Sequence, residues 1–262
     1  MVIESRSNPI VKAARTLSSA KARKETGTHL IEGEKLVLEA LSSGAQITDL
    51  FVEAGKAFPT PEGMRLHWVT PMVLECICQL KNSQGVAAVA KTPDTTMPEE
   101  FPTGLILVLD GVQDPGNVGA ILRSADAFGA TGALLSPDCA DPYNPKTLRA
   151  AMGSTYHLPL WQGDVALGLD RMRKQGFAAV CGHLQGKGTL PQCADKLALV
   201  IGSEGAGVSP EVAKRCILYR LPMRGRAESL NASVAAGILI YQVSEAFYGG
   251  TGQQDEARQT GR

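Results

Sequence analysis

Three segments of the chain combine glycine-rich turns with isolated charged or amide side chains, a composition typical of ligand-binding loops. The first segment runs Asp114-Pro-Gly-Asn-Val-Gly-Ala-Ile-Leu-Arg123. Asn117 stands where the N-cap of a helix is expected, after a Pro-Gly turn. Small residues surround Arg123 on one face of that helix, so its guanidinium could hold a phosphate through two hydrogen bonds. The alternative is an ion pair between Arg123 and a surface carboxylate.

The second segment, Ile201-Gly-Ser-Glu-Gly-Ala-Gly207, follows an apolar run that reads as a strand. Its glycines let the main chain approach a ligand closely. Their order differs from the Gly-x-Gly-x-x-Gly dinucleotide fingerprint, and no Walker lysine follows them. Glu204 has no packing reason to be acidic and is therefore a candidate site residue. The alternative is a carboxylate at a helix terminus or at an interface.

The third segment, Leu221-Pro-Met-Arg-Gly-Arg-Ala-Glu-Ser-Leu-Asn231, leads from a strand through a flexible loop into the last helix. Ser229 is expected to cap that helix. Asn231 is expected to be buried in its first turn, where an amide needs a hydrogen-bond partner. All three loops should lie at the carboxyl ends of parallel strands, where open α/β sheets bind ligands. The residues alone thus predict a ligand site built mainly of backbone.

In their order and spacing, the three segments resemble the motifs of the SpoU–TrmH branch of the SPOUT RNA methyltransferases, over residues 105–248. The resemblance implies a homodimer formed through this domain, a deep C-terminal trefoil knot and methyl transfer to a ribose 2′-hydroxyl. It also implies that S-adenosylmethionine binds mostly through the main chain of Gly202, Leu221 and Leu230. The catalytic residues that it implies are Arg123, Asn117 as a positioning group, and Glu204, Ser229 and Asn231 in support.

The family assigns Arg123 the role of base, and the chemistry of arginine favours another role. Because arginine stays protonated in proteins, we interpret Arg123 as holding the adjacent RNA phosphate and stabilising the developing alkoxide. The role as base stays open at this point. The sequence does not identify another proton acceptor.

The first 24 residues carry six basic side chains and one acidic one, a charge excess that could neutralise phosphates. The alternative is a solvated helix face. Ser5-Arg-Ser-Asn-Pro-Ile-Val-Lys12 and Leu30-Ile-Glu-Gly-Glu-Lys35 resemble the substrate-binding domain common in this family, which is similar in fold to ribosomal proteins that recognise bent RNA helices. The resemblance predicts RNA contacts at Lys12, Lys21, Arg23 and Lys24. It favours ribosomal RNA as the substrate, with transfer RNA as the alternative.

Two domains are expected to position these residues: an α/β RNA-binding domain at 1–92 and a methyltransferase domain at 104–250. Three prolines predict a linker at 93–103, and residues 251–262 are expected to form a flexible tail. In the second domain, continuous apolar runs alternate with helical patterns, which predicts a parallel sheet covered on both faces. The runs are 105–109, 132–135, 177–181, 197–201 and 217–221; the helices are 118–128, 146–152, 165–174, 210–215 and 230–247.

The composition limits the remaining classes of protein. The chain has 262 residues, 44% of them hydrophobic and 20% charged, and its formal net charge is zero. No apolar run is long enough to span a bilayer and no signal peptide is visible, so the cytoplasm is expected. The six cysteines lack Cys-x-x-Cys or finger spacing, so we expect thiols and no metal. Two rivals remain, a nicotinamide-dependent oxidoreductase and a non-catalytic RNA-binding protein.

Overall fold

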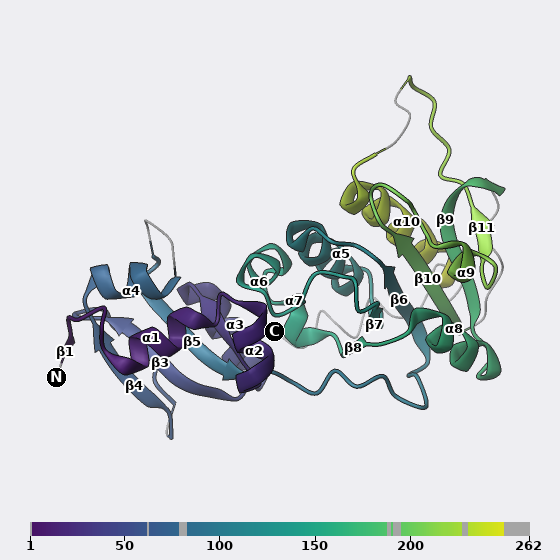
Figure 1. Ribbon diagram of the computed structural model, residues 1–262. Helices are drawn as coiled ribbons and strands as arrows, with labels where there is room; N and C mark the ends of the chain where they lie inside the picture. The colour runs from purple at the N-terminus through teal and green to yellow at the C-terminus, as the bar shows by residue number, and fades with distance from the viewer. Residues whose placement is uncertain are drawn as a thin grey trace. The chain divides into compact units, whose positions relative to one another are not determined.

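The computed structural model describes residues 2–61, 63–78, 83–187, 190, 195–226 and 230–248. These residues form two units, which are described separately (Figure 1). The N-terminal unit contains Met1–Asp94 together with Asp141–His157. The C-terminal unit contains Thr95–Ala140 and the chain from Leu158 onward. The backbone therefore leaves the second unit once and returns to it.

The N-terminal unit is built on a five-stranded mixed sheet in the order β1-β4-β3-β5-β2. Its strands are β1 (Val2–Ile3), β2 (Thr28–Glu32), β3 (Ile47–Glu53), β4 (Arg65–Val69) and β5 (Val86–Lys91). Its first helices are α1 (Pro9–Thr16), α2 (Ala20–Thr26), α3 (Glu34–Ser42) and α4 (Pro71–Cys78). Apolar residues of α1 and α4 pack around Phe51, which is fully buried on β3. Asn8 caps α1 by accepting from the Ile10 amide, and Pro9 takes the first helical position.

Two helices of the N-terminal unit come from the middle of the chain. These are α6 (Pro145–Ala151) and α7 (Ser154–His157). The sequence pattern places them in the 104–250 domain, because helical periodicity shows that a face is apolar and not which sheet covers it. In the structure α6 contacts β2, so its buried face completes the first core.

The C-terminal unit is a six-stranded parallel sheet in the order β11-β9-β10-β6-β7-β8. Its strands are β6 (Gly104–Asp110), β7 (Ala130–Leu135), β8 (Leu160–Gln162), β9 (Ala178–Lys187), β10 (Lys196–Gly202) and β11 (Ile217–Tyr219). The central strands β6 and β10 are buried along almost their whole length, which explains their uninterrupted apolar runs. This arrangement confirms the predicted parallel α/β sheet.

Helices lie on both faces of the second sheet (Figure 1). They are α5 (Pro115–Ala127), α8 (Val165–Lys174), α9 (Pro210–Ala213) and α10 (Ala232–Tyr248). Buried residues of α8 and α9 form one core with Ile106 and Val108 of β6. Helix α10 packs against α5 and also contacts β10. Because Gly202 pairs with Asp110 in register, the loops that follow β10 and β6 start side by side.

Within the described ranges, no helix combines the length and the apolar character that crossing a bilayer requires. The same part of the chain holds no group of three or more His, Cys, Asp or Glu side chains placed to bind a metal ion. Five cysteines are free thiols there, and Cys193 lies outside the described residues.

Candidate active site

Helix α5 begins one turn earlier than its sequence pattern indicates. Asp114 is its N-cap and accepts from the Asn117 amide at 3.0 Å, and Pro115 occupies the first helical position. The prediction that Asn117 caps the helix is therefore wrong. An aspartate before proline already supplies the extended backbone and the acceptor that a cap needs. The side chain of Asn117 is thereby free for other contacts.

Asn117 joins the three glycine-rich segments. Its Nδ2 donates to Glu204 Oε1 at 2.5 Å. Its Oδ1 accepts from Asn231 Nδ2 at 3.4 Å. A side-chain amide carries donors and an acceptor, so one asparagine can fix both neighbours at once. The structure thus brings together three of the five predicted catalytic residues.

Asn231 differs from its predicted environment. Its side chain is exposed, whereas the sequence predicts burial. Its Oδ1 accepts from the Ser233 and Val234 amides at 2.9 and 3.3 Å, so Asn231 caps α10. That capping role explains why a small polar residue precedes α10, and it does not require Asn231 to be buried. The cap predicted at Ser229 lies outside the described residues.

The glycine loop after β10 is closed by its own main chain. Ser203 and Gly207 exchange two backbone hydrogen bonds of 3.0 Å, and the φ of Gly207 is +70°. A Cβ on Gly202 would lie 2.1 Å from the carbonyl carbon of Gly207. Because no side chain fits at that distance, the loop itself requires glycine at position 202. The Ser209 amide then donates to Asp110 Oδ2 at 2.7 Å and anchors the end of the loop to β6.

Arg123 lies on α5, nine residues beyond Asp114, with its side chain exposed. Among the described residues it forms no hydrogen bond or ion pair, so the surface ion pair considered from the sequence is not observed there. Its five donors are open to an oxyanion. An exposed arginine on the helix that also carries Asn117 is suited to hold a phosphate.

The residues predicted to hold the cofactor lie at the ends of β10 and β11 and at the start of α10. Leu221 is partly buried, whereas Leu230 and Met223 expose 38% and 39% of their surface. The positions of a Cβ on Gly205 and on Gly225 are open space. Exposed apolar side chains beside open, glycine-rich backbone fit the base and ribose of a nucleoside. The residues present therefore fit S-adenosylmethionine.

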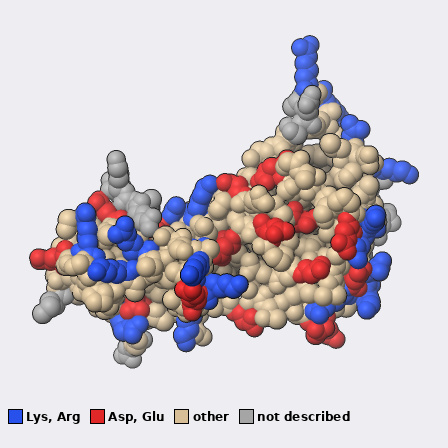
Figure 2. Space-filling model, in the orientation of Figure 1, with Lys and Arg blue, Asp and Glu red and all other residues tan. Residues whose placement is uncertain are grey.

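Three of the four predicted RNA contacts lie on the surface of the N-terminal unit. Lys12, Lys21 and Lys24 are exposed, and Lys21 pairs only loosely with Glu25, at 3.8 Å. Figure 2 shows Lys and Arg side chains gathered on the face that carries α1. These positions are compatible with contact to an RNA backbone.

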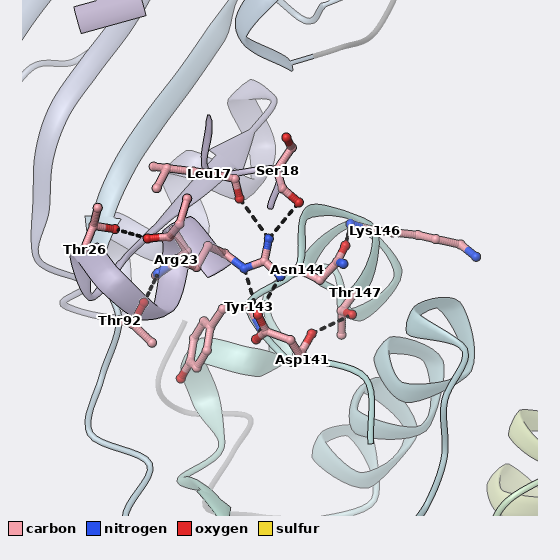
Figure 3. Close-up of polar contacts among 12 residues, drawn as sticks. Leu17, Ser18, Arg23, Thr26, Thr92, Asp141, Tyr143, Asn144, Lys146 and Thr147 are labelled. Atoms are coloured by element: carbon pink, nitrogen blue, oxygen red, sulfur yellow. Dashed lines mark hydrogen bonds and ion pairs between the residues drawn. The ribbon is translucent and has the colours of Figure 1, made fainter. Parts of the chain in front are cut away.

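Arg23 is the exception among these basic residues, because only 4% of it is exposed. Its Nε donates to Asp141 Oδ2 at 2.7 Å, and its Nη1 donates to the carbonyl oxygens of Leu17 and Ser18 (Figure 3). All of these partners are internal, so the predicted RNA contact of Arg23 is wrong. The sequence carries no sign of this burial, since the acceptor lies 118 residues away.

Comparisons with known proteins cover both units. The model of the SpoU rRNA Methylase family matches residues 104–241, and that of the MRM3-like substrate binding domain matches residues 8–88. The chain is 35% identical over 248 residues to the 23S rRNA (guanosine(2553)-2′-O)-methyltransferase RlmP of Bacillus subtilis. That match covers 92% of this chain and 98% of the relative.

Two solved structures extend the likeness to the fold. The AdoMet-bound rRNA methyltransferase from Sinorhizobium meliloti has a TM-score of 0.84 and 32% identity, and the match covers 94% of this chain and 97% of that one. The SpoU methyltransferase AviRb from Streptomyces viridochromogenes, in complex with AdoMet, has a TM-score of 0.80 and 25% identity, with 91% and 97% covered. Both likenesses span the two units.

Proposed function

We propose a substrate for this chain from the premise that it belongs to the SpoU rRNA methylase family. The chain is an S-adenosylmethionine-dependent methyltransferase that acts on a ribose 2′-hydroxyl of ribosomal RNA. The finer substrate that we propose is the ribose of a guanosine in 23S ribosomal RNA. The Bacillus subtilis relative is named for that reaction, and the chain matches 98% of its length.

The observation that carries the proposal is the contact of Asn117 with both Glu204 and Asn231. When bound, S-adenosylmethionine supplies an electrophilic methyl group on a sulfonium. Gly202, Leu221 and Leu230 are proposed to hold it. Methyl transfer then requires a nucleophile aligned with that methyl group, and alignment is what a fixed polar network provides.

Arg123 is proposed to hold the phosphate next to the reacting ribose and to stabilise the 2′-oxygen as it loses its proton. A guanidinium keeps its charge and offers a planar pair of donors, which matches a phosphate. Asn117, fixed by Glu204 and Asn231, lies six residues before Arg123 on α5 and sets the position of the helix start. Ser229 is proposed to support the same site.

The N-terminal unit is proposed to bind the RNA, through Lys12, Lys21 and Lys24. Charge neutralisation by exposed lysines supplies affinity without reading sequence, which suits a domain that positions a large structured RNA. Ribosomal RNA is the proposed target, so we place the enzyme in the cytoplasm. The match of the substrate-binding domain model to residues 8–88 supports this assignment.

A homodimer is proposed to form through α10. Val234, Ile238 and Tyr241 expose 51%, 38% and 49% of their surface. The ring of Phe128, at the end of α5, lies tilted against that of Tyr241, with ring centroids 5.4 Å apart. Residues three and four apart share one helix face. An exposed apolar stripe of this kind is typical of an interface between copies of a chain.

The family's trefoil knot is also proposed for this chain. It requires segments of backbone far apart in the sequence to approach at close range, and Gly186 supports such an approach. A Cβ on Gly186 would lie 2.5 Å from the carbonyl carbon of Tyr219. Only glycine permits such approaches.

The test of the proposed substrate is methyl transfer by the purified protein. Deproteinised 23S ribosomal RNA and bulk transfer RNA are each incubated with S-adenosylmethionine carrying a tritiated methyl group. The expected result is label on the 23S RNA, with 2′-O-methylation mapped to one guanosine by reverse-transcription stops. Label on the transfer RNA alone would overturn the substrate while leaving the reaction class intact.

A further inference from the structure

Residues 141–157, named here the docking segment, belong to the N-terminal unit although the family's methyltransferase model includes them. The segment is attached to that unit by four polar contacts, each between side chains far apart in the sequence. They are Arg23–Asp141, His29–Tyr156, Glu32–Arg149 and Glu39–His157. These four specific pairs fix the position of the docking segment on the N-terminal unit.

The pair at the start of the docking segment is the most strongly built. Besides the 2.7 Å hydrogen bond from Arg23 Nε, the second terminal nitrogen of Arg23 lies 2.6 Å from Asp141 Oδ2. Asp141 Oδ1 accepts from the Tyr143 amide at 2.8 Å, and its carbonyl oxygen accepts from Thr147 Oγ1 at 3.0 Å. Asp141 thus fixes the turn that starts α6 while it binds Arg23 (Figure 3).

Arg23 in turn ties Asp141 to the helices of the proposed RNA surface. Its Nη1 donates to the carbonyl oxygens of Leu17 and Ser18 at 2.8 and 3.0 Å, at the end of α1. Arg23 itself lies within α2. A buried ion pair adds little net stability, because desolvation of both charges offsets their attraction. Its contribution here is a fixed position for Asp141 relative to α1 and α2.

The residues just before Asp141 bind the loop that leads into the catalytic helix. The Ala140 amide donates to the Val112 carbonyl oxygen at 2.9 Å. The Gly111 amide donates to Ser136 Oγ, also at 2.9 Å. Residues 136–140 therefore hold residues 111–112, two positions before Asp114, the N-cap of α5. A displacement of residue 141 reaches this loop through a single peptide bond.

We propose that Arg23 is a positioning residue for methyl transfer, acting through Asp141 on the loop before α5 and so on Asn117. This inference rests on the proposed function where it is tested by the rate of methyl transfer. Its test by amide hydrogen exchange does not depend on that function. Arg23 touches neither RNA nor cofactor in this scheme. Its effect is therefore on the rate of the bound complex and not on its formation.

The experiment compares two carboxylate-to-amide variants of the full-length protein. Asp141→Asn keeps the shape of the side chain and removes the charge that pairs with Arg23. Glu39→Gln makes the same change at the other end of the docking segment, where Glu39 pairs with His157 at 2.9 Å. Each protein is assayed for single-turnover methyl transfer to saturating 23S ribosomal RNA, for RNA and S-adenosylmethionine affinity, and for amide hydrogen exchange of residues 109–118 without RNA.

For Asp141→Asn the expected result is a rate lower by about 10- to 100-fold, the cost of a misplaced catalytic group. Both affinities should stay within about twofold of the wild type, and amide exchange at residues 109–118 should rise. Glu39→Gln should leave the rate within about twofold. Arg23→Met should reproduce the Asp141→Asn phenotype, and the double variant should be no slower than either single one, because both act through one pair.

A normal rate with normal exchange in both Asp141→Asn and Arg23→Met would overturn the proposal. So would a loss confined to RNA affinity, because that outcome assigns the pair to RNA binding alone. If the wild type transfers no methyl group to any RNA, the proposed function fails. Increased exchange at residues 109–118 in Asp141→Asn and not in Glu39→Gln would still support the coupling.

Discussion

The side-chain amide of Asn117 donates to the Glu204 carboxylate at 2.5 Å, although 87 residues separate the two in the chain. A hydrogen bond to a charged acceptor is about twice as strong as one between neutral groups. The side chain of Asn117 is available for this contact because Asp114 already caps the helix. Glu204 therefore sets the orientation of the amide that joins all three motifs.

Glu204→Ala is expected to lower the single-turnover rate by about tenfold or more, because Asn117 loses the acceptor that orients it. The melting temperature should not change, since the Glu204 side chain is exposed. Glu211→Ala removes another exposed carboxylate, on α9, and serves as the control. A wild-type rate in Glu204→Ala would exclude an orienting role for this carboxylate.

Arg123→Lys keeps the positive charge and loses the planar pair of donors. Turnover should fall on the order of a hundredfold, as for the loss of one preorganised electrostatic donor, while cofactor affinity stays close to normal. The measurement is single-turnover methyl transfer across pH for both proteins. If Arg123 were the base, the lysine variant would recover strongly at alkaline pH, because lysine loses its proton more readily than arginine.

Gly202→Ala is expected to abolish or greatly weaken S-adenosylmethionine binding by deforming the protein's own loop. The new Cβ would lie 2.1 Å from Gly207, so the 203–207 turn would have to open. Calorimetric titration with S-adenosylmethionine measures the effect. Gly205→Ala adds its Cβ to open space and should cost much less affinity. Equal S-adenosylmethionine affinities for the two variants would contradict the conclusion that the loop requires glycine at position 202.

Lys21→Ala combined with Lys24→Ala should weaken RNA binding and flatten its dependence on salt. Each lost phosphate contact lowers the slope of log affinity against log salt by roughly 0.7 to 0.9. Filter binding to 23S ribosomal RNA at several salt concentrations measures that slope. Arg173→Ala with Lys174→Ala removes two charges from α8 and is the matched control. An unchanged slope in the Lys21→Ala, Lys24→Ala variant would show that these lysines form a solvated helix face and do not contact RNA.

His29 should make the protein less stable in mild acid. Burial lowers the pKa of His29 to about 4, and its ring contacts Tyr156 and Thr92. The unfolded chain gains a proton near pH 6.5 while the folded chain does not, so stability is present above that pH and falls as the pH decreases towards 4. Between pH 7 and pH 5 the loss should be about 2 kcal/mol.

Urea unfolding of the wild type and of His29→Gln at both pH values isolates this contribution. Glutamine can keep a hydrogen bond to Tyr156 and does not titrate. The variant should lose about 2 kcal/mol less than the wild type between the two pH values. Parallel losses in the two proteins would show that another group dominates the acid response.

Much of the C-terminal unit could be predicted from the sequence, because its strands are buried on both faces. A strand such as β6 has no solvent side, so its apolar run is continuous and its end is marked by the first polar residue, Asp110. The loops that follow such strands must meet at one edge of the sheet. That rule is enough to bring Asn117 and Glu204 together from the order of the strands and loops alone.

The N-cap of α5 and the burial of Arg23 could not be predicted in the same way. Asp114 and Asn117 are both good N-cap residues. The partner of Asn117, Glu204, lies 87 positions away and is not visible in the local sequence. Arg23 lies in a basic run whose other members are exposed, and its partner comes from the docking segment. Local pattern describes the composition of a helix face, whereas a buried charge depends on one distant residue.

The docking segment also limits how this protein can be divided and recombined. Glu32 has only 5% of its side chain exposed and pairs with Arg149, and burial raises its pKa even beside that arginine. A gene fragment that ends in the linker would encode the sheet of the N-terminal unit without Arg149, and would leave this carboxylate to face the core alone. The substrate-binding domain therefore cannot be exchanged as residues of the N-terminal sequence alone. A fragment that keeps this ion pair must include the docking segment, which carries α6 and α7.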